Sequence, residues 1–363
     1  MQKHIPSLLT AALLLLGTFT AFAGNPDRQG EAGAQQLLMN PWAQSAGLHT
    51  LNTASITGAQ ALRLNVAGVA RIVGTQVNVG HALYMRGTDI SMSGLGIAQR
   101  IGENGAIGIS VMALDFGDIN VTTVGSPEGT GATYSPNFFN LGIGYSHIFE
   151  NKVSVGVTLR AVSESISDVA ASAVAIDAGV QYVTGDNDEF QFGISLRNIG
   201  SQMIYEGDGL TFTQNIEREG TTFPLTVEQR SEDFELQSVL NIGLAYDVLH
   251  EGNGGKNKLT LMGNFTSNAF SRDQIGAAAE YTFNRMFTLR AGYRYTLGVD
   301  PDDITGEELY NGIAGGFSVQ VPFNKDEPNG SKFAIDYGYR ATSIYDGTHN
   351  IGLRIDLPRK QLD

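Results

Sequence analysis

The chain has 363 residues, a formal net charge of −14 and no cysteine. The lack of cysteine excludes disulfides, thiolate metal sites, a thiol nucleophile and a lipidated N-terminal cysteine, and the acidic balance argues against nucleic acid as a partner. The mean hydropathy of −0.07 is compatible with a membrane β-barrel, in which only every second strand residue faces lipid.

The first 23 residues have the organisation of a secretory signal peptide. Lys3 supplies a positive start, residues 8–16 form an apolar core, and Ala21-Phe22-Ala23 is a cleavage site with small residues. The alternative, an N-terminal membrane anchor, needs roughly 20 apolar residues. We therefore predict export and cleavage after Ala23, and no later apolar run is long enough to cross a bilayer as a helix.

Residues 24–75 differ from the rest of the chain. They mix short helical patterns with loops and show little alternation of apolar and polar residues. We interpret them as an N-terminal periplasmic segment that plugs or caps the domain formed by residues 76–363.

That domain shows repeated apolar/polar alternation, which is clearest over residues 287–297. Phe287, Leu289 and Tyr293 fall on one face of an extended strand, whereas Arg290 and Arg294 fall on the other. The pattern predicts about fourteen antiparallel strands of a transmembrane β-barrel, an all-β fold. The predicted strands are 76–85, 88–100, 105–115, 138–149, 153–164, 173–184, 189–199, 235–247, 257–267, 272–284, 287–297, 309–320, 332–342 and 347–357.

The connections between these strands alternate in length. The long ones are 116–137, 165–172, 200–234 and 298–308, and typical short ones are Glu150-Asn151-Lys152 and Asn284-Arg285-Met286. Long loops outside and short turns inside are typical of outer-membrane barrels, and this rule puts the N-terminal segment in the periplasm of a Gram-negative cell. The connections 248–256 and 268–271 depart from the rule, and the segment 221–230 is either a further strand or part of the long loop. A soluble β-sandwich is the alternative fold.

The two faces of the predicted strands differ in polarity. Rows such as Val153, Val155, Val157 and Leu159 are apolar and should face lipid. The opposite face carries charged residues, which should point into the lumen because a charge in lipid costs roughly 2–4 kcal/mol. This set comprises Arg160, Asp177, Arg197, Glu280, Arg290, Arg294, Asp336, Arg340, Arg354 and Asp356. We favour a network that fills the barrel and anchors the plug over a selective conduit, because both charge signs are mixed.

No motif for catalysis, a cofactor or a metal is found. The six histidines lack metal-ligand spacing, and no Gly-x-Ser-x-Gly elbow occurs in a suitable place. The cluster Asp300-Pro301-Asp302-Asp303 fits solvated loop charge better than a calcium site. The sequence therefore nominates no catalytic residue and favours a non-enzymatic protein.

Three stretches resemble one family of barrels. The segment 62–71 contains Asn65-Val66-Ala67-Gly68, which resembles the Asn-Pro-Ala-Gly-Leu motif of FadL-type barrels, with Val66 at the position of the proline. Residues 101–117 resemble an early hairpin of the PorV/PorQ branch, and residues 332–342 with 347–355 resemble its terminal hairpin. The resemblance implies a FadL-like barrel of fourteen strands with an N-terminal plug and a plug motif at Asn65, Ala67 and Gly68.

The resemblance also implies a function and partners. PorV is associated with type IX secretion in Bacteroidota, where it receives cargo proteins through their C-terminal domains and passes them to a surface attachment complex. We therefore expect a protein-binding outer-membrane barrel whose partners are membrane lipid, secretion-system proteins and cargo C-terminal domains. The alternative is a FadL-like transporter of a hydrophobic small molecule. An envelope enzyme is the third possibility and has little support.

Overall fold

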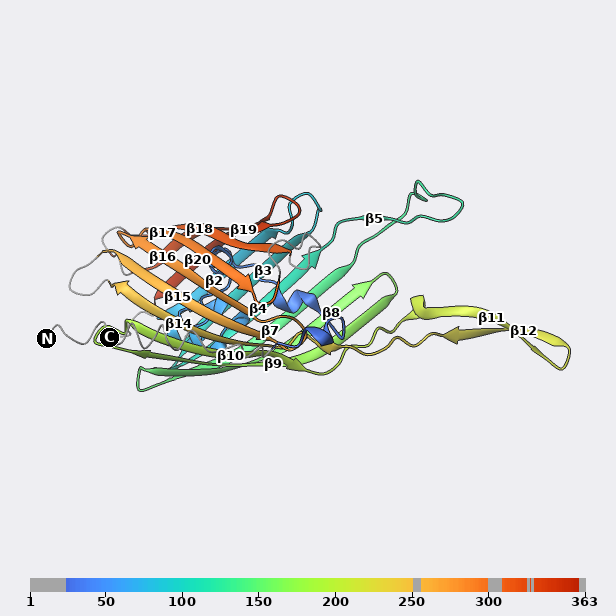
Figure 1. Ribbon diagram of the computed structural model, residues 1–363, viewed down its shortest axis with the longest axis horizontal. Coiled ribbons are helices and arrows are strands. Elements are labelled where there is room, and N and C mark those ends of the chain that lie inside the picture. The colour runs from blue at the N-terminus through green and yellow to red at the C-terminus, as the bar shows by residue number, and fades with distance from the viewer. Residues whose placement is uncertain (1–23, 251–255, 300–308, 325–326, 328–329, 359–363) are drawn as a thin grey trace.

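A closed barrel forms the body of the molecule (Figure 1). The structure is a computed structural model that describes residues 24–250, 256–299, 309–324, 327 and 330–358. The predicted signal peptide and the Asp300–Asp303 cluster lie outside the described residues. The barrel strands are β2 (Gly74–Leu83), β3 (Ser91–Ile101), β4 (Gly105–Asp115), β7 (Asn137–Phe149), β8 (Val153–Ile166), β9 (Val169–Thr184), β10 (Phe190–Gly200), β14 (Val239–Leu249), β15 (Lys258–Asn268), β16 (Gln274–Phe283), β17 (Phe287–Thr296), β18 (Tyr310–Pro322), β19 (Lys332–Thr342) and β20 (Thr348–Pro358). The prediction of a fourteen-stranded antiparallel barrel is confirmed, with the ring closed by pairing of β2 with β20.

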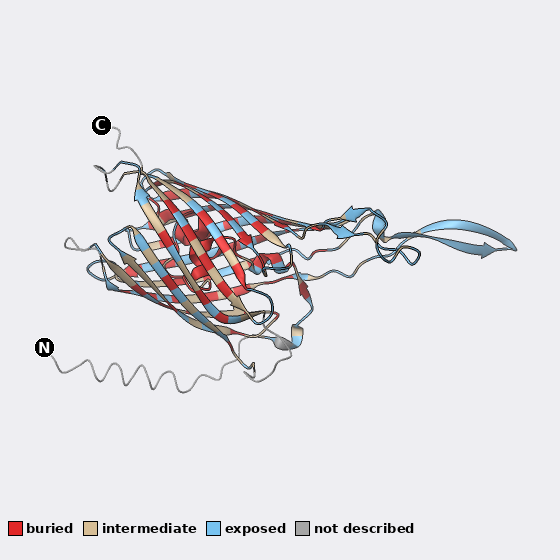
Figure 2. Cartoon of the chain, turned by 90° about the horizontal axis from the view of Figure 1, so that it is seen from above, coloured by how far each residue is buried: buried red, intermediate tan, exposed pale blue. Residues whose placement is uncertain are grey.

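The apolar and polar residues that alternate in the sequence lie on the outside and the inside of this ring, respectively. In β17, Leu289 is 62% exposed on the outer wall and Arg290 is 9% exposed within the lumen. Figure 2 shows the same alternation of exposed and buried residues along most of the strands. Because every strand has two paired neighbours, no backbone edge of the barrel is left open to lipid.

One predicted long connection is wrong. The segment 165–172 was expected as a loop, but β8 continues to Ile166 and β9 begins at Val169, and these two residues pair. Only Ser167 and Asp168 remain between the strands, with Ser167 at a φ of 51°, which is typical of a tight hairpin turn. The small residues that open β9 give almost no polarity contrast, so alternation could not mark its start.

The long loops define one end of the barrel, here called the long-loop end, and the opposite end is the short-turn end. Two loops at the long-loop end carry their own hairpins, β5 (Ile119–Asn120) with β6 (Thr133–Tyr134) and β11 (Thr211–Arg218) with β12 (Thr221–Glu228). Most of the segment 221–230 is thus strand β12, which lies within the long loop and is not part of the barrel. The hairpin β11–β12 extends well beyond the ring (Figure 1).

Residues 24–73 run through the lumen and form the plug. Their short elements are η1 (Pro26–Arg28), β1 (Ala32–Gly33), η2 (Gln35–Leu38), α2 (Ala43–Gly47), η3 (Ala59–Arg63) and η4 (Val66–Arg71). Strand β1 pairs with β13 (Glu235–Leu236) of the long loop.

The plug begins at the long-loop end. The backbone N–H of Gly24 donates to the carboxylate of Asp273 at 2.7 Å, in the turn between β15 and β16. The chain then crosses the lumen and enters β2 at the short-turn end. The start of the plug therefore shares an end with the long loops, whereas its last residues lie at the short-turn end.

Glycine lets the plug approach the wall closely on the side of β7 to β9. A Cβ atom at Gly156 of β8 would lie 2.9 Å from the carbonyl oxygen of Val66, and one at Gly179 of β9 would lie 2.1 Å from the side-chain oxygen of Asn65. The apolar residues of η3 and η4 fill this half of the lumen, where Leu62, Val66 and Val69 are buried.

Candidate functional site

The plug motif is held by hydrogen bonds to both the plug and the wall. Asn65 begins η4, accepts from the N–H of Ala67 at 3.2 Å, and donates through Nδ2 to the carbonyls of Thr53 and Val180 at 3.0 and 3.1 Å. Gly68 fits because a Cβ there would lie 2.0 Å from the carbonyl oxygen of Ile56. The motif therefore fixes a tight turn of the plug against β9.

Arg160 anchors the plug to the wall from β8. Its guanidinium pairs with Asp177 of β9 at 2.5 Å, donates to Asn140 at 2.8 Å and donates to the plug carbonyl of Leu62 at 2.8 Å. Asp177 also accepts from the backbone N–H of Asn198 at 2.7 Å. This buried cation therefore has a full set of partners from wall and plug.

Arginines also bind the plug's backbone beyond this pair. Arg197 of β10 donates to the carbonyl of Arg63 at 2.6 Å. Arg63 itself donates to the carbonyls of Met39 and Gln36, at 2.7 and 2.5 Å. These bonds give backbone carbonyls of the irregular plug hydrogen-bond partners from arginine side chains.

A second group of charges lines β16 to β20. Arg290 pairs with Glu280 at 2.6 Å and donates to Ser318, whose hydroxyl donates to Asp336. Arg354 lies 3.1 Å from Asp356 and donates to Gln320 at 2.8 Å. Plug residues reach the same carboxylates, since Gln44 donates to Asp336 at 3.1 Å.

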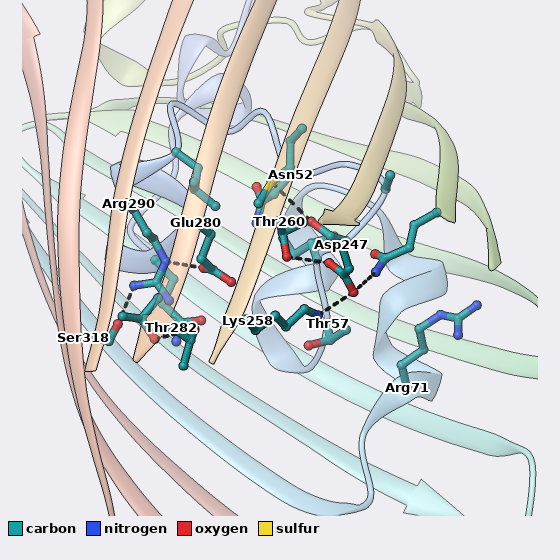
Figure 3. A pocket seen from close by; sticks show the side chains of 18 of the residues that line it. Asn52, Thr57, Arg71, Asp247, Lys258, Thr260, Glu280, Thr282, Arg290 and Ser318 are labelled. Atoms are coloured by element: carbon teal, nitrogen blue, oxygen red, sulfur yellow. Dashed lines mark hydrogen bonds and ion pairs between the residues drawn. The ribbon is translucent and has the colours of Figure 1, made fainter. Parts of the chain in front are cut away.

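A cavity of about 570 Å³ opens at the short-turn end beside these charges (Figure 3). Its wall carries the pair Glu280–Arg290 and a second pair, Asp247 with Lys258 at 3.0 Å. Thr260 also donates to Asp247, at 2.5 Å. Both charge signs are thus present in this cavity.

A second cavity, of about 360 Å³, lies at the long-loop end. Its charged lining consists of Arg197, Arg294 and Arg340, and amide and hydroxyl side chains with a few apolar residues form the remainder. The guanidinium of Arg340 lies over the ring of Tyr310, 4.5 Å from its centroid. Tyr310 in turn packs edge-on against the plug residue His49, with ring centroids 5.6 Å apart.

Residues 47–54 of the plug, here called the septum, lie between the two cavities. Leu48, Asn52 and Ala54 line the cavity at the short-turn end, whereas Thr50 lines the one at the long-loop end. Both cavities run along strands β14 to β19, so the septum interrupts a space along one wall of the barrel.

The backbone of the septum is strained. His49 and Thr50 have φ values of 52° and 60°, in the left-handed region, which is rare for a β-branched residue such as Thr50. Each such residue costs on the order of 1 kcal/mol or more. The septum is also packed against its surroundings. Leu48 and Leu51 contact Ala245, Met262 and Ala278 of the wall, and the carbonyl of Thr53 accepts hydrogen bonds from Asn65 and Gln181.

The charged residues that the sequence assigned to the lumen fall into three places. Arg160 and Asp177 form an ion pair whose arginine binds the plug carbonyl of Leu62. Glu280, Arg290, Asp336, Arg354 and Asp356 form the group along β16 to β20. Arg197, Arg294 and Arg340 line the cavity at the long-loop end, where Arg197 also binds the plug carbonyl of Arg63. The sequence interpretation missed Arg63, Asp247 and Lys258. Parity would have placed Asp247 inside, because it follows the outward Tyr246, whereas Arg63 lies in a segment without periodicity.

Within the described residues, no group of three or more acidic, histidine or cysteine side chains is arranged to hold a metal. No helix among them is long and apolar enough to cross a membrane.

Comparison with known proteins supports the fold. No protein-family model and no curated protein matches the sequence. Among solved structures, the Pseudomonas putida toluene transporter TodX shares 15% identity at a TM-score of 0.54, over 87% of this chain and 97% of its own. A mutant of TodX, described as a monoaromatic hydrocarbon channel, gives 14% identity and a TM-score of 0.58 over 88% and 99%. A Pseudomonas aeruginosa FadL homologue shares 10% identity at a TM-score of 0.50, over 87% of this chain and 98% of its own. The chain therefore has a FadL-like barrel fold, and at these identities the likeness concerns the fold alone.

Proposed function

We propose that this protein is an outer-membrane transporter of small molecules whose path is gated by the septum. The observation that carries the proposal is the pair of cavities that enter from opposite ends along β14 to β19 and are separated by residues 47–54. The FadL-like fold, which is shared with proteins described as hydrocarbon channels, supports the same role.

The strain at His49 and Thr50 supports a movable septum. A backbone in a sparsely populated conformation already has a raised free energy, so its rearrangement costs less than that of an unstrained backbone. The opposite half of the lumen is packed with the buried apolar residues of η3 and η4. Passage therefore needs only a local shift of the septum and not removal of the plug.

The lining of the path bears on the type of solute. Both cavities are bordered mainly by charged, amide and hydroxyl side chains. A purely apolar solute would desolvate these groups without replacing their hydrogen bonds, which is unfavourable. The proposed path therefore suits polar small molecules better than the hydrocarbons named for the structural neighbours.

A cysteine lock tests the gate, and the native chain contains no cysteine to interfere. The pair Thr53→Cys and Gly243→Cys joins the septum to β14, because a Cβ at position 243 would lie 3.0 Å from the Cβ of Thr53. A shift of roughly half an ångström brings this spacing into the disulfide range. Oxidised protein in liposomes should lose flux of small tracers, and reduction should restore it.

The two single-cysteine variants are the matched controls, and their flux should not respond to oxidation. The tracers are glucose, glucuronate and toluene, compared with empty liposomes. Unchanged flux through the fully oxidised pair would refute the gate. A correctly folded wild-type barrel that passes none of the tracers would refute transport itself.

Protein binding is a second candidate, and the hairpin β11–β12 favours it. Its paired strands place Phe212, Ile216, Phe223 and Leu225 on one exposed face. The opposite face is polar and rich in threonine. An apolar face on a projecting hairpin is a typical protein contact surface, and such a role agrees with the implied resemblance to PorV and type IX secretion.

This candidate predicts loss of partners when the apolar face is changed. The variant Phe212→Asp with Leu225→Asp should fail to copurify a secretion-system protein or cargo C-terminal domain after mild detergent extraction from the native host. The matched control, Thr213→Asp with Thr226→Asp, changes the polar face and should retain the partner. Equal recovery with both variants would exclude this surface, and recovery of no protein with wild type would exclude the candidate.

A further inference from the structure

The described lining of the cavity at the long-loop end has arginine as its charged residue type, and Arg340 and Arg197 are the two that bear on its chemistry. We propose that this cavity binds a hydroxylated organic anion, a sugar acid of the uronate class, with the carboxylate on Arg340. The inference rests on the proposed transport function, because it names the solute that the long-loop end would take in.

Arg340 is the principal group of the site. Its residue is 3% exposed, and its Nε and Nη2 atoms have no hydrogen-bond partner. One face of its guanidinium is occupied by the ring of Tyr310. The N–H groups in the guanidinium plane are therefore left to bind acceptors, and a carboxylate matches their geometry with two parallel bonds.

The electrostatics favour an anion. A buried cation without an opposite charge is unfavourable, and a bound carboxylate would compensate it. Arg197 lines the same cavity and its Nε atom also lacks a hydrogen-bond partner, although Asp177 lies near enough to attract its charge. The cavity at the short-turn end differs because Asp247 and Glu280 balance cations there.

The uncharged lining favours a ligand with hydroxyl groups. Gln237 and Gln274 each use the amide nitrogen within the protein, donating to the carbonyl of Ala32 at 3.3 Å and to Thr296 at 3.4 Å. Both residues line the cavity, and a hydroxyl group is a suitable donor to an amide oxygen. A fatty or aromatic acid would satisfy the arginine but not these amides.

The volume of about 360 Å³ lies within the range of small-molecule sites. Tyr84 and Phe270 supply apolar surface on the same lining. A sugar ring presents C–H faces as well as hydroxyl edges, so both kinds of lining have a counterpart on such a ligand.

Calorimetric titration of the full-length protein in detergent tests the site. D-glucuronate should bind, whereas D-glucose, which lacks the charge, and benzoate, which lacks the hydroxyl groups, should bind at least about tenfold more weakly. Equal affinity for glucuronate and glucose would overturn the role of Arg340. Equal affinity for glucuronate and benzoate, or binding of inorganic phosphate alone, would overturn the role of the amides.

Substitutions assign the binding to this cavity. Arg340→Gln should weaken glucuronate binding about tenfold or more, and Arg340→Lys should recover part of the loss. Arg354→Gln is the matched control, because it removes an arginine from the other cavity and should leave affinity unchanged. Gln274→Leu keeps every charge and should still weaken glucuronate binding, so the proposal is testable even if Arg340 variants fail to fold.

The binding measurement is independent of transport. Glucuronate binding without flux of any tracer would keep this inference and refute the proposed function. Flux of other tracers without glucuronate binding would keep the proposed function and refute this inference.

Discussion

Arg160 and Asp177 form an ion pair between adjacent strands of the barrel, with Nη2 and Oδ2 2.5 Å apart and both side chains at most 4% exposed. The same guanidinium donates to the carbonyl of Leu62, so the pair also ties the plug to the wall. We predict that Asp177→Asn lowers the free energy of unfolding by about 3–5 kcal/mol, because it leaves a buried charge uncompensated. Urea unfolding followed by tryptophan fluorescence measures this change, and Trp42 is the single tryptophan of the chain.

The double variant Arg160→Met with Asp177→Leu provides the comparison. Removal of both charges should recover part of the stability that Asp177→Asn loses. A double variant less stable than the single one would show that the hydrogen bonds to Asn140 and Leu62 dominate, contrary to this prediction.

Glycine at position 156 is expected to be required for the plug to dock. The variant Gly156→Ala should lower the free energy of unfolding by about 1–3 kcal/mol, because its Cβ would lie 2.9 Å from the backbone of Val66. Gly263→Ala on β15 is the matched control, since a Cβ there has no atom within 4 Å. Similar losses in both variants would point to strand effects of alanine and not to the plug.

Relief of strain in the septum should stabilise the protein. Thr50 has a φ of 60°, so Thr50→Gly should raise the free energy of unfolding by about 1 kcal/mol. Thr57→Gly, at an exposed plug position without positive φ, should have no stabilising effect. Thermal unfolding of the two variants in the same detergent measures the difference, and a destabilised Thr50→Gly would contradict the strain argument.

An arginine on the outer wall should be costly only where lipid covers it. Leu289 on β17 is 62% exposed, and Leu289→Arg should lower stability in lipid by roughly 2–4 kcal/mol. Leu225→Arg changes an equally apolar residue on the projecting hairpin and should be nearly neutral. Unfolding in phospholipid vesicles tests the pair, and equal effects would place both positions in the same environment.

The strands were predictable because burial on one face imposes a period of two on each of them. The row Val153, Val155, Val157 and Leu159 carries this signal directly. The same parity assigned Arg290 and Asp336 to the lumen face. This assignment requires no knowledge of the partners that they bind.

Features that depend on packing were not predictable. The start of β9 was missed because its alanines and serine carry no polarity contrast. The path of the plug has no period at all, so neither the end at which Gly24 lies nor the contacts of Arg63 could be deduced. The two cavities arise only from where the septum crosses the lumen, which no local pattern encodes.

The route of the plug has a consequence for biogenesis. Its first residues are tied to the turn after β15, and its last residues continue into β2, which pairs with β20 to complete the ring. A segment that crosses the whole lumen is most readily enclosed while the first and last strands have not yet joined. Assembly of the barrel should therefore be a wrapping of strands around the N-terminal segment, and the late step should be the seam between β2 and β20.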